Sequence, residues 1–327
     1  MSSMKNIAVL AGGDSSEYVI SERSAAHIID EIDKNKYRAF LVMIREGSWN
    51  VIKKDKKYPL DLNDFSFSDG KKKTKFNFAY IIIHGTPGED GKLQSYLELM
   101  GIPYNTSGVL CSALTFNKYA CKNYLKNFDI TIPESVVINH DKPYDLSEII
   151  EKVGLPCFVK PNNGGSSFGT NKVTKQDDVE HAISEAFHED NEIIIESFVK
   201  GTEVTCGLIK TKEKDYIFPA TEIVSKNEFF DFEAKYTVGM ADEITPARIN
   251  DTLHRRIQEL ASQIYDILNC KGLVRVDFII KGNQIFFLEL NTIPGMSHES
   301  IVPKQIRTFG MTISEVLDVI IQNGIGD

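Results

Sequence analysis

The segment that most constrains this chain is a pair of apolar stretches around a short polar centre, at residues 273–291, which read LVRVDFIIKGNQIFFLELN. This pattern predicts a β-hairpin. Successive side chains of a strand point to opposite faces, so Arg275 and Asp277 share a face, as Glu289 and Asn291 do on the partner strand. If the strands pair about the turn, one face of a sheet carries an arginine, two carboxylates and an amide.

Two interpretations of this polar face compete. A salt bridge at the end of a sheet explains Arg275 with one carboxylate, but it leaves the second carboxylate and Asn291 without a partner. Mg²⁺ takes one or two carboxylates and lets substrate phosphates complete its shell. The hairpin therefore predicts a magnesium site. His298 and Glu299 follow the hairpin without an H-E-x-x-H pattern, so they carry no zinc signature.

A glycine-rich segment at residues 160–170, KPNNGGSSFGT, also allows two interpretations. Its match to G-x-S-x-G would make Ser167 the nucleophile of a serine hydrolase, but that motif needs a strand followed by a helix. Here the flanking residues predict a strand, a loop and a second strand. A Walker loop fails because Thr170 follows Gly169 where a lysine is required. Free backbone N–H groups and hydroxyls beside Lys160 favour a cradle for phosphate oxygens.

The first hundred residues alternate between buried-strand and helical patterns, which predicts a small parallel α/β lobe. Glu17 follows the glycines after the first strand, and His84 begins a glycine-rich loop after another. Open α/β sheets bind ligands at such strand ends. Farther along, residues 112–128 predict one helix. Residues 225–249 show weak periodicity and predict a long functional loop.

Composition narrows the class of protein further. The chain has 327 residues and a formal net charge of −9, which argues against nucleic-acid or membrane-surface partners. Its five scattered cysteines predict reduced, buried thiols. The N-terminus does not read as a signal peptide, and no apolar run approaches the roughly 20 residues of a membrane span. We therefore expect a soluble cytoplasmic protein with two or three lobes.

Taken together and in order, the motifs resemble the D-alanine–D-alanine ligases of the ATP-grasp superfamily, nearly from end to end. The residues that carry the resemblance are GGDSSEYVIS, HGTPGEDGKLQ, LMGIPYNTSG, VKPNNGGSSFG, EAKY, RVDF and LELNTIPGMSHESIVP. The resemblance implies an α/β and α+β fold in three lobes. These would be an N-terminal parallel, Rossmann-like substrate domain at 1–107, a central ATP-grasp lobe at 108–206 and a C-terminal ATP-grasp lobe with the metal site at 207–327.

The resemblance also implies an activity and the residues behind it. Two D-alanine molecules would be joined at the expense of ATP for peptidoglycan precursor synthesis, through a D-alanyl phosphate, with release of ADP and phosphate. Two Mg²⁺ ions, which Mn²⁺ could replace, would bind Asp277, Glu289 and Asn291. The implied nucleotide contacts are Lys118, Lys160, Ser166, Ser167, Glu196, Ser197, Phe198, Val199, Glu203 and Lys235. The implied substrate contacts are Glu17, His84, Arg275, Gly295, Ser300 and Ile301. The implied catalytic groups are Glu17, Ser166, Tyr236, Arg275 and Gly295.

The resemblance further implies a homodimer and two closing segments, the glycine loop 164–169 and the 225–249 loop. By the same resemblance, Tyr236 would favour D-alanine over D-lactate as the second substrate. Ser95 and Ser297 depart from the residues common in the family, which leaves a ligase using D-serine or D-lactate as an alternative. A nucleotide-binding regulator without activity is a further alternative, against which the intact charged residues argue.

Overall fold

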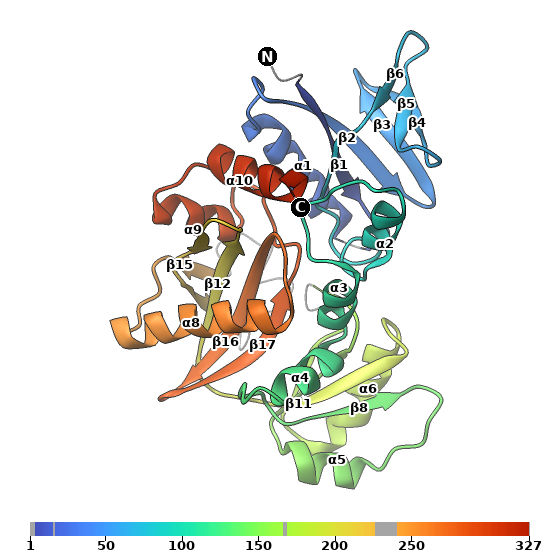
Figure 1. Ribbon diagram of the computed structural model, residues 1–327. Helices are drawn as coiled ribbons and strands as arrows, with labels where there is room; N and C mark the ends of the chain where they lie inside the picture. Colours follow the sequence, from blue (N-terminus) through green and yellow to red (C-terminus); the bar gives the residue numbers. More distant parts are fainter. Residues whose placement is uncertain (1–3, 16, 166–168, 226–240, 327) are drawn as a thin grey trace.

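The computed structural model describes residues 4–15, 17–165, 169–225 and 241–326. Its strands form three sheets that succeed one another along the chain (Figure 1). The strand orders are β6-β5-β4-β3-β2-β1-β7 in the first sheet, β10-β9-β11-β8 in the second and β15-β14-β12-β16-β17 in the third, with β13 paired to β12. The structure therefore mixes parallel α/β and antiparallel α+β architecture.

Only part of the first sheet is parallel. Strands β2, β1 and β7 pair in parallel, as the sequence predicts, but β3 to β6 extend the sheet in antiparallel pairs that the prediction lacked. The reason lies in two tight turns, where Glu46, Gly47, Lys54 and Asp55 all have positive φ. Such turns join neighbouring antiparallel strands. Glycine is the residue type that most clearly indicates positive φ in a sequence. The elements are β1 (Lys5–Gly12), α1 (Tyr18–Glu31), β2 (Tyr37–Arg45), β3 (Ser48–Lys53), β4 (Lys56–Asp61), β5 (Ser66–Ser68), β6 (Lys73–Lys75), β7 (Phe78–Ile81) and α2 (Lys92–Leu99).

The second sheet contains the glycine-rich hairpin. Strands β9 and β10 pair antiparallel on either side of the glycines, which confirms the predicted strand, loop and strand. The single helix predicted over residues 112–128 is wrong. Asn117 is extended, with φ −89° and ψ 102°, and its side chain caps a new helix by accepting a hydrogen bond from Ala120 N. The elements are α3 (Val109–Phe116), α4 (Lys118–Lys126), β8 (Ser135–Asn139), α5 (Leu146–Val153), β9 (Cys157–Pro161), β10 (Asn171–Val173), η1 (Gln176–Asp178), α6 (Val179–Phe187) and β11 (Glu192–Ser197).

The third sheet is antiparallel and is covered by α8, while the last helix returns to the first sheet. Helix α10 packs against α1 and β7, and its apolar side chains belong to the same core as those of β1 (Figure 1). The first and last parts of the chain therefore share one core. The elements are β12 (Thr202–Lys210), β13 (Asp215–Ile217), β14 (Thr221–Ser225), β15 (Ala241–Ile244), α8 (Asp251–Ile267), β16 (Leu273–Lys281), β17 (Gln284–Asn291), α9 (Ile301–Phe309) and α10 (Ile313–Gly326).

All five cysteines are buried and none forms a disulfide, as the sequence predicts. The closest pair is Cys111 and Cys270, whose Sγ atoms lie 3.6 Å apart. Every helix within the described ranges is too short or too polar to cross a membrane.

Candidate functional site

A cavity of about 900 Å³ is lined by residues from all three sheets and their loops. The N-terminal part contributes the loop after β1, the central part contributes β9, its glycine loop and the end of β11, and the C-terminal part contributes β12 and β17. Of the predicted residues, those on its wall are Glu17, Lys118, Lys160, Glu196, Ser197, Phe198, Val199, Glu203 and Glu289. Residues predicted from distant motifs therefore face one space.

The polar face of the last hairpin forms as predicted. Strand register places Arg275 opposite Asn291 and Asp277 opposite Glu289. Arg275 donates from Nε and Nη2 to the two oxygens of Asp277, at 2.8 and 2.7 Å. Asn291 Nδ2 donates to Asp277 Oδ2 at 3.1 Å, so the expectation that a salt bridge leaves Asn291 without a partner is wrong. Thr205 Oγ1 also donates to Asp277 Oδ1, at 2.5 Å.

The hairpin residues fit a magnesium ion by their donor chemistry. Asp277 is buried, and its carboxylate is held in place by three side chains, including Thr205 from β12. Glu289 lies across from it, and a small pocket beside the main cavity is lined by both carboxylates together with Glu203 and Arg275. Within the described ranges, no group of three or more His, Cys, Asp or Glu side chains could hold a metal. Mg²⁺ needs no such cage, because one or two carboxylates and substrate phosphates suffice.

A charged cluster lies between β9, β11 and the start of α4. Lys118 Nζ donates to Gly164 O at 2.6 Å, which ties the start of α4 to the loop. Lys160 Nζ donates to Glu196 Oε2 at 2.5 Å, and the fully buried Lys122 donates to the other oxygen of Glu196. Burial lowers the pKa of Lys122 well below its usual value, and the neighbouring Lys160 charge adds to this effect. The sequence offered no signal for Lys122, because its partner is 74 residues away.

Glu17 lies where the glycine loop approaches the N-terminal part. It is the N-cap of α1 and is 7% exposed. A Cβ atom on Gly165 would lie 3.0 Å from Glu17 Oε2, so the loop passes close to this carboxylate. Gly12 and Gly13 both have positive φ, which lets the chain turn sharply from β1 before α1 begins.

His84 is buried beyond β7, and its Nε2 atom is one of two buried side-chain polar atoms within the described ranges that lack a hydrogen-bond partner. Burial lowers the pKa of His84, while the Glu17 charge and a hydrogen bond to the backbone of Ile293 oppose this. A buried polar atom without a partner requires an explanation, and a bound ligand supplies one. Sequence reasoning missed Glu89 in the same loop, where burial and the Glu17 charge raise the pKa of the carboxyl to about 8.

The segment after the last hairpin forms a tight loop that ends at Ser300, the N-cap of α9. Ser300 Oγ accepts a hydrogen bond from Ser297 N at 3.1 Å and lies 2.7 Å from Ser297 Oγ. A Cβ atom on Gly295 would lie 2.9 Å from Ser300 Oγ, so only glycine fits without displacing this hydroxyl. Ile301 follows and lines the small pocket next to Arg275.

Four of the predicted site residues lie outside the described ranges. These are Ser166, Ser167, Lys235 and Tyr236. The segments that flank Ser167 are nevertheless informative, because β9 and β10 pair directly with each other. A hydrolase elbow needs a helix after the serine, so the surroundings of this loop contradict the hydrolase alternative.

Comparison with known proteins agrees with this geometry. Models of the D-ala D-ala ligase N-terminus and C-terminus match residues 6–107 and 124–322. A D-alanine–D-alanine ligase of Bacteroides fragilis is 52% identical over 98% of this chain and 99% of its own.

Solved structures give the same result. The VanG D-Ala:D-Ser ligase of Enterococcus faecalis has a TM-score of 0.88 at 32% identity and covers 98% of this chain and 99% of its own. A D-alanine–D-alanine ligase of Bacillus anthracis complexed with ATP has a TM-score of 0.80 at 30% identity and covers 99% and 98%. The three-sheet fold, the cavity and these matches along nearly the whole chain show that it belongs to the D-alanine–D-alanine ligase family.

Proposed function

We propose that this chain joins two D-alanine molecules to D-alanyl-D-alanine at the expense of ATP, as an intermediate step in making peptidoglycan precursors. The observation that carries the proposal is the cavity itself. Lys118, Lys160, Glu17 and Glu289, from all three parts of the chain, line a space of about 900 Å³, and Glu289 also lines the adjoining small pocket together with Asp277. Several relatives about 50% identical over nearly the whole chain carry the name of this ligase.

The central part of the cavity suits ATP. Lys118 and Lys160 would contact phosphate oxygens, with the glycine loop above them and with Ser166, Ser167 and Lys235 added on closure. Residues 196–199 line the cavity wall and would run along the adenine, while Glu203 would accept from the ribose hydroxyls. A solved relative from Bacillus anthracis in complex with ATP supports ATP as the ligand of this family.

Asp277, Glu289 and Asn291 would hold Mg²⁺, as two ions in the proposed arrangement. When bound, the metal offsets negative charge on the phosphates of ATP. The residues of the chain meanwhile fix the geometry: Arg275, Asn291 and Thr205 orient the Asp277 carboxylate through four hydrogen bonds. Such outer contacts typically keep ligands in one orientation.

The first D-alanine would bind on the N-terminal side. Glu17 would receive its ammonium group, and the unpartnered Nε2 of His84 would face its carboxylate. That carboxylate then attacks the γ-phosphorus of ATP, the bond to the β-phosphate oxygen breaks, and D-alanyl phosphate and ADP form. The acyl phosphate hydrolyses readily, so water must be kept out while it waits. The proposed covers are the loop 164–169 and the segment 225–249, in which the structure places strand β15 where the sequence predicted only a loop.

The second D-alanine would bind beside the loop that ends in Ser300. Ser300 and the neighbouring Ile301 would contact this acceptor, whose neutral amine attacks the acyl carbon. Arg275 and the backbone N–H of Gly295 would stabilise the oxyanion of the tetrahedral intermediate, which expels phosphate as the attacking nitrogen loses a proton to the departing phosphate. Tyr236, Ser166 and Glu17 would form a hydrogen-bonded triad that connects the lobes.

One alternative concerns the second substrate. The VanG relative carries the name of a D-Ala:D-Ser ligase, so the fold accommodates a different acceptor. The higher identity to D-alanine–D-alanine ligases favours D-alanine. The homodimer stays a prediction from the resemblance, and the cytoplasmic location stays a prediction from the sequence.

An ADP-release assay with D-alanine, D-serine and D-lactate, each tested alone and in pairs, checks the proposal. We expect turnover with D-alanine alone and a product with the mass of D-alanyl-D-alanine. No turnover unless D-serine or D-lactate is added would refute the D-alanine assignment. Activity without ATP, together with labelling of Ser167 by a fluorophosphonate, would refute the ligase.

A further inference from the structure

Residues 292–300, which follow β17 and end at Ser300, are called the acceptor loop. This loop is anchored on helix α1 of the N-terminal part, although it continues a strand of the C-terminal sheet. Met296 lies at the centre of this anchor. Its side chain is 1% exposed and belongs to the core of the first sheet. Its N–H donates to Ser24 Oγ at 3.2 Å, and its carbonyl oxygen lies 2.6 Å from His27 Nδ1. Both backbone groups of one residue are therefore held by α1.

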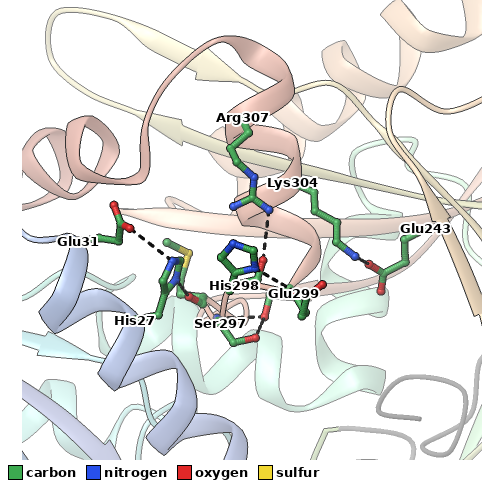
Figure 2. Close-up of polar contacts among 10 residues, drawn as sticks. His27, Glu31, Glu243, Ser297, His298, Glu299, Lys304 and Arg307 are labelled. Carbon is green, nitrogen blue, oxygen red and sulfur yellow. Dashed lines mark hydrogen bonds and ion pairs between the residues drawn. The ribbon is translucent and has the colours of Figure 1, made fainter. Parts of the chain in front are cut away.

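The bond to His27 fixes the state of the imidazole. A carbonyl oxygen only accepts hydrogen bonds, so Nδ1 of His27 must carry the hydrogen. The His27 side chain is only 13% exposed, and its ring meets His298 edge to face with centroids 5.8 Å apart. Figure 2 shows His27 directed at the loop, with Glu31 behind it. Glu31 Oε1 is 4.0 Å from Nε2, beyond hydrogen-bond distance, so the bond to Met296 is the main polar contact of the ring.

The same peptide unit links His27 to the acceptor site. The carbonyl of Met296 and the N–H of Ser297 belong to one planar peptide group, so fixing one fixes the direction of the other. Ser297 N donates to Ser300 Oγ at 3.1 Å. His27 thus holds one side of a rigid unit whose other side holds the hydroxyl of Ser300.

We propose that His27 is a positioning residue for the acceptor D-alanine, acting through the Met296–Ser297 peptide on Ser300. This inference rests on the proposed function. Ser24 assists by holding the N–H of Met296. Neither residue touches the donor D-alanine or ATP in the proposed arrangement, so their loss should affect acceptor binding and leave formation of D-alanyl phosphate intact.

The central test compares His27→Asn with His27→Gln. The Nδ2 atom of asparagine is bonded to Cγ, as Nδ1 of histidine is, so His27→Asn can restore the bond to Met296 O. Glutamine carries its amide one atom farther out and mimics Nε2 instead. We expect His27→Ala and His27→Gln to raise the acceptor KM by about 3- to 10-fold, the range set by loss of one hydrogen bond. His27→Asn should stay near the unaltered protein.

Two measurements separate the half-reactions. Dipeptide formation over a wide range of D-alanine concentrations reports the acceptor KM. Trapping of D-alanyl phosphate with hydroxylamine, at D-alanine concentrations too low to fill the acceptor site, reports the donor half-reaction, which we expect to be unchanged. Glu31→Gln is the matched control on the same helix, because it leaves the Nδ1 bond intact, and we expect it to alter neither measurement.

Three results would overturn the inference: an unchanged acceptor KM in His27→Ala, equal behaviour of the asparagine and glutamine variants, or a parallel fall in hydroxamate formation. Should His27→Ala not fold, the asparagine and glutamine pair still decides the question. Failure of the proposed function is distinct, because the unaltered protein would then form no dipeptide.

Discussion

The Glu196→Gln substitution probes the buried charge cluster between β9, β11 and the start of α4. Glu196 is 2% exposed, and its carboxylate binds two ammonium groups, those of Lys122 and Lys160. Glutamine keeps the shape of the side chain and removes the negative charge. Lys160 is 16% exposed and can turn towards the cavity, whereas Lys122 is fully buried and cannot reach water. The cost of the substitution therefore falls on Lys122.

The structure limits the size of that cost. Removing one partner of a buried ion pair typically destabilises a protein by about 3–5 kcal/mol, because the other charge is left alone. Lys122 can avoid being an unpaired buried charge by losing its proton. From an unperturbed pKa of about 10.4, release at about pH 7.5 costs about 4 kcal/mol, at 1.36 kcal/mol per pKa unit. This value is a ceiling, because burial already lowers the pKa of Lys122 in the native protein.

The sign of the pH dependence follows from this proton release. In the variant, the folded state holds Lys122 neutral while the unfolded chain holds it charged. The unfolded state then binds more protons, so stability rises with pH, by up to about 1.4 kcal/mol per unit. The deficit relative to the unaltered protein should therefore shrink as the pH rises towards the folded pKa of Lys122 in the unaltered protein, because above that value both folded proteins hold Lys122 neutral.

Thermal unfolding without nucleotide, from about pH 7.5 to about pH 9.5, measures this deficit. Lys122→Met leaves Glu196 paired with Lys160 and should cost less than Glu196→Gln. The double variant Lys122→Met with Glu196→Gln should regain most of the stability lost in Glu196→Gln. The reasoning is wrong if Glu196→Gln is as stable as the unaltered protein, if its deficit does not change with pH, or if the two losses add in the double variant.

Three further substitutions test the site. Glu289→Gln should lower ADP release by more than about 100-fold at saturating ATP, and a matching loss of thermal stability would point to damage to the fold instead. Arg275→Lys keeps the charge but loses the bidentate contact with Asp277. We expect kcat to fall by about 10²- to 10³-fold. A near-normal kcat in steady-state kinetics would contradict the proposed role of Arg275 at the oxyanion. Gly207→Ala would bring a Cβ within 2.6 Å of Gln305 Oε1, which is buried and hydrogen-bonded to Gly207 N. The substitution should lower the free energy of unfolding by about 1–3 kcal/mol in a denaturant titration. The KM for ATP should stay constant.

The alternation of apolar and polar residues was enough to predict the β16–β17 hairpin, which carries the proposed magnesium ligands. In residues 273–291, the period of two fixes which side chains share a face, and the short turn fixes the partner strand. Arg275 and Asp277 accordingly meet across from Asn291 and Glu289. The same reasoning predicted the glycine hairpin, because its two strands are also neighbours in sequence. These features required no knowledge of long-range packing.

The errors and omissions have a different origin. The turns that lead into the antiparallel strands β3 and β4 depend on positive φ at Glu46 and Lys54, residue types that rarely adopt this conformation. The sequence around Asn117 has a continuous helical pattern, but Asn117 ends one helix and is the N-cap of the next. The sequence did not predict the contacts of Thr205 and Lys122, because their hydrogen-bond partners lie 72 and 74 residues away in the chain. Only the order of the strands in the folded sheets brings these groups together.

The placement of the two proposed substrate subsites on one helix has a mechanical consequence. Glu17 caps the start of α1, while His27 lies ten residues later on the same helix and holds the acceptor loop. At 1.5 Å per residue, the helix sets about 15 Å between these two points. Lys160 belongs to the second sheet, and among the described residues the hydrophobic core of that sheet is separate from the core that includes α1. Closure over ATP can therefore move the phosphate-binding groups while α1 keeps donor and acceptor at a fixed separation, so we expect nucleotide affinity and acceptor affinity to respond to different substitutions.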